Sequence, residues 1–228
     1  MFPLKRSLLL CGRKKNIKKK PSGFPFKERD LSSDGSAGST PLSSTKDMFT
    51  KEQKNRLLEI ARQTIEEYLL SGKIKEFAEP DPVLLEEKGA FVTLHKHGEL
   101  RGCIGNIIGR GPLYKTVRDM SIESATADPR FRPVTLNELK SIKIEISILS
   151  VPEREFKPEN IIMGKHGVIV KKGFQSGVFL PQVASETGWS REEFLSNLCV
   201  HKAGLAPSAW KDKDTELYTF TAEVFAKE

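Results

Sequence analysis

The fold is decided by residues 90–105, AFVTLHKHGELRGCIG. Two runs rich in apolar residues flank a central His-Gly pair, which predicts a β-hairpin. Because side chains alternate along a strand, Arg101 and Cys103 share one face of the second strand. Gly102 and Gly105 flank the cysteine and leave room for another group to approach the backbone. The hairpin therefore brings a thiol and a cation together at a position where the flanking glycines have no side chains to block access.

Two interpretations of Cys103 stay open. A nearby arginine favours the charged thiolate, which is the nucleophilic form, so Arg101 beside Cys103 is typical of a reactive site. Gly102 and Gly105 would then line the approach of a ligand. Alternatively, Cys103 is an ordinary buried cysteine of a strand.

The hairpin register depends on the length of its turn. We expect a short turn that pairs Lys96 with Glu99 and places Val92 opposite Cys103. A three-residue turn would instead place Thr93 opposite the cysteine.

The remaining patterns alternate between helices and strands. Capping boxes, in which a Ser or Thr is followed three residues later by Glu or Gln, begin helices near residues 50 and 190. A third helix is predicted over 112–127. Strands are predicted at 142–148, 167–170, 177–180 and 217–225. Antiparallel hairpins with helices packed against them predict an α+β fold.

Several segments in a fixed order give the chain, from about residue 48 to its end, a resemblance to the AMMECR1 domain family. One is the motif LRGCIG at residues 100–105. The others are Asp128-Pro129-Arg130-Phe131, Gly164-Lys165-His166-Gly167, Phe179-Leu180-Pro181-Gln182-Val183, Gly188-Trp189, Lys202-Ala203-Gly204-Leu205 and Trp210.

The resemblance implies two subdomains, each with an antiparallel sheet flanked by helices. The larger subdomain contains both termini, the smaller one is inserted into it, and the motif cysteine lies near their interface. The resemblance also implies a Memo-like protein and a radical SAM protein as companions, as in the three-protein AmmeMemoRadiSam system. It implies no particular reaction, because the fold alone does not assign one.

Four residues outside the hairpin are candidate partners of Cys103. His166 lies between glycines in a loop and is our candidate base, since an imidazole can take a thiol proton; the alternative is a histidine that only belongs to a turn. Lys202 lies in the last turn of a helix, where it either caps carbonyl groups or places its amine in a cleft. Asp128 and Arg130 either bind a ligand at the site or pair with each other at a helix end.

No cofactor is expected, because the chain has neither a phosphate-binding loop nor a dinucleotide-binding glycine pattern. His95 and His97 form an H-x-H pair at a turn, but no third ligand lies near them in the sequence, so no metal is expected. The ligand of a site at Cys103 would be an unidentified small molecule.

The net charge of +7 is concentrated at the N-terminus. Residues 1–47 carry eleven Lys and Arg against four Asp and Glu, a surplus equal to that of the whole chain. A nucleic-acid-binding fold carries its positive charge on the folded surface, so we do not expect the domain at 48–228 to bind nucleic acid. The N-terminal segment is a lysine run followed by a Ser/Gly-rich stretch, which predicts a disordered extension. A start at Met48 and a localisation signal are the alternatives.

The cysteines argue against an extracellular protein. Three cysteines, at positions 11, 103 and 199, are far apart and odd in number, so no disulfide framework is predicted. Cys199 continues the apolar stripe of a helix and is predicted to be a core residue. No segment approaches the roughly 20 apolar residues of a membrane span. We therefore expect a cytoplasmic protein without a membrane segment.

Two classes of function remain. In the first, the protein is an enzyme or small-ligand site in which Cys103 is the nucleophile, Arg101 holds an anion or the thiolate, and His166 or Lys202 carries a proton. In the second, it is a non-catalytic adaptor, and the motif only shapes a tight hairpin at a subdomain junction.

Overall fold

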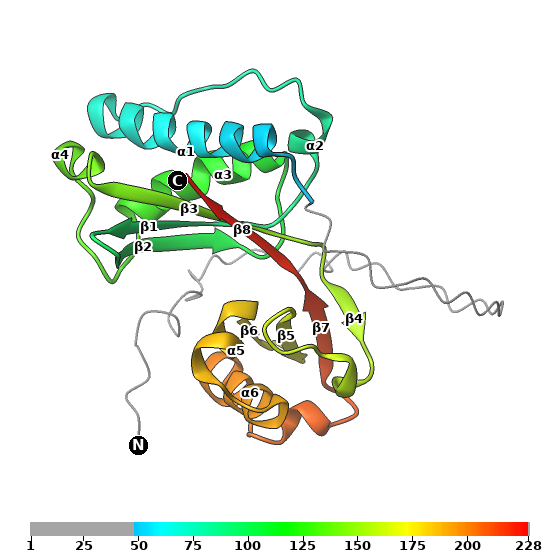
Figure 1. Ribbon diagram of the computed structural model, residues 1–228. Helices are drawn as coiled ribbons and strands as arrows, with labels where there is room; N and C mark the ends of the chain where they lie inside the picture. The colour runs from blue at the N-terminus through cyan, green and yellow to red at the C-terminus, as the bar shows by residue number, and fades with distance from the viewer. Residues whose placement is uncertain (1–47, 228) are drawn as a thin grey trace.

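The computed structural model describes residues 48–227 and confirms the α+β fold. It contains two four-stranded antiparallel sheets, each with helices on one face (Figure 1). The predicted extension at 1–47 lies outside the described residues. Within the described part of the chain, no helix combines the length and the apolar character needed to cross a bilayer.

The first sheet carries the hairpin, and its second hairpin strand is an edge strand. In spatial order the strands are β2 (Glu99–Asn106), β1 (Ala90–Lys96), β3 (Ile142–Leu149) and β8 (Ala222–Ala226). Because β2 has a neighbour on one side only, every second residue of β2 directs its N–H and C=O groups away from the sheet.

Helices α1 (Lys51–Ser71) and α3 (Leu113–Thr126) cover one face of the first sheet (Figure 1). The predicted capping box at Thr50 begins α1, and Gly72 ends it with a φ of 70°. Two short helices, α2 (Pro82–Leu85) and α4 (Leu136–Leu139), lie at the margins of this layer. The even-numbered isoleucines of β3 join the core beneath α1 and α3, as the alternation predicts.

The second sheet belongs to the smaller subdomain. Its strands, in spatial order, are β4 (Glu153–Glu155), β7 (Glu216–Phe220), β5 (Gly167–Lys172) and β6 (Gln175–Phe179). Its helical elements are η1 (Pro158–Asn160), α5 (Pro181–Thr187), α6 (Arg191–Leu198), the π-helical turn η2 (Cys199–Ala203) and η3 (Ala209–Lys211). The predicted capping box at Ser190 begins α6, and Cys199 is fully buried in the core of this subdomain.

The chain passes between the two sheets at two adjacent points. The single strand predicted at 217–225 is wrong, because it is interrupted at Thr221 and contributes β7 to one sheet and β8 to the other. The Ser150 N–H donates to the Thr221 carbonyl over 2.9 Å, and the Thr221 N–H donates to the Ser150 hydroxyl over 3.0 Å. These bonds tie the two crossings together.

The hairpin register differs from the expected one by a residue. Its two-residue turn, and the pairing of the residues that flank the turn, are as predicted. Arg101 is then skipped in the pairing with β1, as a β-bulge that hydrophobic alternation does not reveal. Thr93, rather than the expected Val92, therefore lies opposite Cys103.

Candidate functional site

The backbone of Cys103 is held from outside the sheet by a buried ion pair. The Asp128 carboxylate accepts a hydrogen bond from the Cys103 N–H over 2.9 Å, and the Arg130 guanidinium donates to the Cys103 carbonyl over 3.3 Å. Asp128 and Arg130 also bind each other over 2.6 Å. Both polar groups that this edge-strand residue turns away from β1 are therefore satisfied.

Asp128 is ionised in this arrangement. Its residue is only 4% exposed, and burial alone would disfavour the charge. Hydrogen bonds from Arg130 and from the Cys103 N–H outweigh burial and hold the pKa of the Asp128 carboxyl below its ordinary value. The pair expected between Asp128 and Arg130 is thus formed, and it serves the backbone of the cysteine.

Helix α3 approaches the same strand from the other side. The Ser124 hydroxyl accepts from the Ile104 N–H over 3.0 Å and donates to the Val92 carbonyl over 2.7 Å, so one side chain links β1 and β2. A Cβ atom on Gly102 would lie 2.3 Å from the Ser124 carbonyl oxygen. Gly102 is therefore required for close packing of α3 against the strand.

The Cys103 side chain lies on the face of the sheet that α1 and α3 leave uncovered. It is partly exposed, and the Thr93 hydroxyl lies 3.3 Å from its sulfur, within hydrogen-bond distance. The cysteine packs against an apolar cluster that joins the two sheets and includes Phe91 of β1 and Ile169 of β5. The position near the subdomain interface, implied by the family resemblance, is confirmed.

Gly105 shapes the same face. A Cβ atom at this position would lie 2.3 Å from the Phe91 ring, which occupies the space that a side chain would need. Gly102 thus leaves room for the backbone of α3 on one face of β2, and Gly105 leaves room for the Phe91 ring on the other face. Sequence reasoning expected this space to admit a ligand.

Arg101 is bound to a carboxylate. Its guanidinium lies 3.1 Å from Glu138, which also binds Lys96 over 2.8 Å. Hydrogen bonds from Arg101 and Lys96 lower the pKa of the Glu138 carboxyl to about 2. The Arg101 guanidinium also lies over the Phe131 ring, 5.9 Å from its centre. Its positive charge is therefore offset within a cluster at the bulge.

His166 and Lys202 occupy other parts of the smaller subdomain. The Nδ1 atom of His166 accepts a hydrogen bond from the Ile162 N–H over 3.2 Å, within the turn that precedes β5, and burial lowers the pKa of this imidazole. Lys202 belongs to η2, where its ammonium lies 5.9 Å from the centre of the Phe179 ring on the helix-covered face of the second sheet. Cys103 packs against the opposite face of that sheet.

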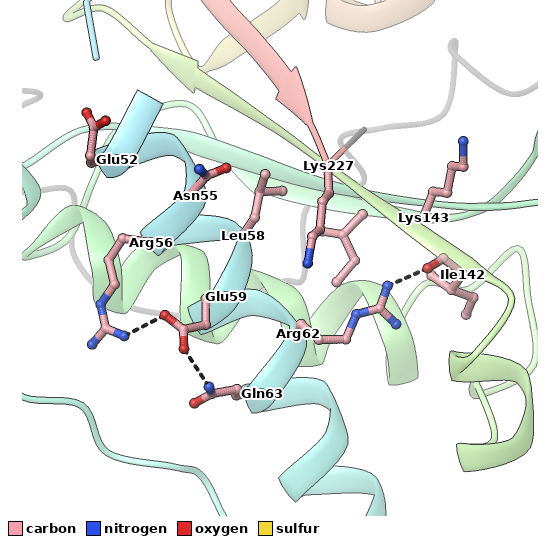
Figure 2. Close-up of a pocket in the computed structure, with 11 residues that line it drawn as sticks. Glu52, Asn55, Arg56, Leu58, Glu59, Arg62, Gln63, Ile142, Lys143 and Lys227 are labelled. Atoms are coloured by element: carbon pink, nitrogen blue, oxygen red, sulfur yellow. Dashed lines mark hydrogen bonds and ion pairs between the residues drawn. The ribbon is translucent and has the colours of Figure 1, made fainter. Parts of the chain in front are cut away.

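The hollows on the first subdomain include two that are not lined by Cys103. The larger, about 840 Å³, runs between α1 and the start of β3 and is lined mainly by polar side chains of α1 (Figure 2). Its Arg62 side chain reaches the Ile142 carbonyl (Figure 2). The smaller, about 380 Å³, lies beside the hairpin turn and is lined by His95, His97 and Glu145 among others. Across the described residues, no three His, Cys, Asp or Glu side chains are grouped so that they could hold a metal ion.

Sequence reasoning missed three residues that shape the site. The expected register placed Val92 opposite Cys103, whereas the structure places Thr93 there, because the bulge gives no signal in the hydrophobic pattern. Ser124 lies in a helix, and in the sequence a serine that faces a sheet cannot be told from any other small residue of the helix. Glu138 belongs to a capping box with Thr135, and that pattern was available in the sequence as a sign of a helix start.

Most of the described part of the chain is similar to known proteins. The family model AMMECR1 matches residues 58–225. The protein PYRAB00100 of Pyrococcus abyssi is 47% identical over 183 residues, which cover 75% of this chain and 89% of that protein. The protein PF1979 of Pyrococcus furiosus is 45% identical over 183 residues, which cover 75% and 87%. The crystal structure of the uncharacterized protein PH0010 from Pyrococcus horikoshii matches with a TM-score of 0.70 at 44% identity, over 76% of this chain and 90% of that one.

Proposed function

The chain belongs to the AMMECR1 family, and we propose that within this fold Cys103 is the reactive group of a small-ligand site. The observation that carries the proposal is the contrast between the two sides of this residue. Its backbone is bound by Asp128 and Arg130, whereas the residue as a whole is partly exposed and its thiol lies beside a hydroxyl. A nucleophile held in one position by its surroundings loses less entropy when it meets a ligand.

Thr93 supports this function directly. In strand pairs where the backbone groups point outward, as those of Cys103 do, facing side chains lie especially close. The Thr93 hydroxyl can donate a hydrogen bond to the sulfur, and a hydrogen bond to the charged form of an acid favours that form. Thr93 therefore promotes the thiolate without carrying a charge itself.

Asp128 and Arg130 act as positioning residues in this proposal. Their polar atoms bind each other and the backbone of Cys103, so they orient the cysteine and leave ligand contact to the thiol. Arg101 contributes a positive charge on the same strand as the thiol, and its bond to Glu138 partly neutralises that charge.

Thiol alkylation of the folded protein tests the proposal. The Cys11→Ser variant of the full chain leaves two cysteines, and peptide mapping by mass spectrometry separates them after treatment with iodoacetamide. Cys199 is the internal control, because it is fully buried and burial raises the pKa of its thiol. We expect Cys103 to react at least about tenfold faster than Cys199 at pH 7.5, since the thiolate is the reacting form. Equal rates would remove the reactive-thiol function and leave the adaptor alternative.

Companion proteins form a separate part of the proposal. The resemblance to the three-protein system supports a Memo-like protein and a radical SAM protein as partners. Co-purification of the tagged chain with these two proteins, expressed together, would show a complex. If each protein elutes alone in size-exclusion chromatography at micromolar concentration, this part of the proposal fails.

A further inference from the structure

The uncovered face of the first sheet places a second titratable side chain next to Cys103. Phe91, Thr93 and His95 alternate on this face of β1, because residues 90, 92 and 94 point into the core beneath α1 and α3. Thr93 is directly opposite Cys103. His95, two residues further along the strand, is therefore a diagonal neighbour of the cysteine on the same face.

We propose that His95 is the acid–base partner of Cys103, an inference that rests on the proposed function of the thiol. Diagonal neighbours on one face of an antiparallel pair lie about 7–8 Å apart, within reach of an aromatic side chain. Thr93, opposite Cys103, and His95, two residues further along, are the polar residues of β1 on this face.

A carboxylate of the neighbouring strand β3, that of Glu145, lies near the imidazole of His95. Glu145 is opposite Thr93, and its carboxylate is 3.9 Å from Nε2 of His95. Thr93 thus lies between Cys103 on β2 and Glu145 on β3, and His95 lies two residues further along β1.

The surroundings of the pair contain few competing charges. Lys143 is opposite His95 on β3, and Arg101 is bound to Glu138. Asp128 and Arg130 face the backbone of Cys103. The second sheet turns mostly apolar groups toward the thiol, together with one tyrosine: Ile169, Val178, Leu180, Tyr218 and Phe220.

Solvent and small molecules have access to His95. The hollow of about 380 Å³ beside the hairpin turn is lined by His95 and Glu145, and also by His97 and Lys143. The imidazole is therefore placed to exchange protons with solvent between turnovers.

The proton balance is simple. The imidazole of His95 takes the proton of the Cys103 thiol, either directly after a rotamer change or through one water molecule, and forms a thiolate and an imidazolium. With iodoacetamide, the thiolate forms an S–C bond as the C–I bond breaks, and iodide leaves. The imidazolium then returns its proton to solvent.

The pH dependence of alkylation tests this inference. Rates at Cys103 are measured from pH 5 to 9 by peptide mapping, with every variant built on Cys11→Ser. His95→Gln is the test variant, and His166→Gln and His201→Gln, in the other subdomain, are matched controls. Without His95 we expect the rate at pH 6.5 to fall about tenfold, which corresponds to a rise of about one unit in the pKa of the thiol. The two controls should stay within about twofold of the parent.

Glu145→Gln provides a second variant with a separate prediction. The substitution removes the charged group that lies 3.9 Å from the imidazole, so the rate profile at Cys103 should change. If neither His95→Gln nor Glu145→Gln alters the profile while Cys103 still reacts in the folded protein, the inference is overturned and the reactive-thiol function stands. If Cys103 does not react before unfolding, the proposed function itself fails.

Discussion

The Asp128 carboxylate accepts a hydrogen bond from the backbone N–H of Cys103 over 2.9 Å, across 25 residues of sequence. This bond occupies an edge-strand group that would otherwise be available to another chain. Together with Arg130 it turns the edge of β2 into a fixed support for the cysteine. The same bonds therefore fix the position of Cys103 and keep the edge of β2 from pairing with another chain.

Asp128→Asn should destabilise the domain by about 3 kcal/mol. The substitution keeps the size of the side chain but leaves the Arg130 charge, whose side chain is 15% exposed, without its carboxylate. The free energy of unfolding from urea titration measures the loss. Glu76→Gln removes the carboxylate that binds Arg118, at a site where the Glu76 side chain is 74% exposed, and should cost less than about 1 kcal/mol. Equal losses in the two variants would contradict the role assigned to Asp128.

Stability should fall in acid partly through Glu138. Its pKa in the folded protein, about 2, is below the ordinary value of 4.5, so its contribution is complete above about pH 4.5 and is lost as the pH falls toward 2. Solvent screens this partly exposed cluster, and we expect a contribution of about 1 kcal/mol.

Glu138→Gln isolates that contribution, because glutamine still completes the capping box with Thr135. Unfolding free energies measured from pH 2 to 7 should depend less steeply on pH in the variant. Parallel curves for the variant and the parent would show that the ion pairs with Arg101 and Lys96 contribute nothing.

Gly102→Val should destabilise the domain by about 1–3 kcal/mol. The added side chain would meet the backbone carbonyl of Ser124, and backbone atoms yield only if α3 moves away from the strand. A urea midpoint equal to that of the parent would mean that α3 has more freedom than its contacts suggest.

Deletion of residues 1–47 should leave the thermal midpoint within about 2 °C of that of the full chain. The reason lies in the sequence, since a lysine run and a Ser/Gly-rich stretch offer little apolar surface to bury. Differential scanning calorimetry of the two chains decides the matter. A drop of several degrees would show that the segment packs on the domain.

The fold was accessible from sequence wherever one signal dominated. The capping boxes at Thr50 and Ser190 and the alternating isoleucines of β3 correspond to elements in the structure. The strand expected at 217–225 was not divided correctly, because a single residue, Thr221, separates two strands that are both rich in apolar residues. No local pattern says that such a run changes sheets.

The candidate site was only partly accessible. Cys103 and Asp128 stood out by residue type and by their place in the family motifs. Thr93 and His95 acquired their relation to the cysteine through the bulge at Arg101, which has no signal in the local sequence pattern. Register errors of one residue exchange the faces of a strand, so this part required the structure.

Cys103 should react from the native state, and the urea dependence of its alkylation decides whether it does. Rates are measured on Cys11→Ser at several urea concentrations below the unfolding transition. We predict a rate at Cys103 that is independent of urea, because no opening is required, and a rate at Cys199 that rises steeply as urea favours unfolding. A rate at Cys103 that rises in parallel with that of Cys199 would show that its thiol is sealed in the folded protein, and would contradict the account.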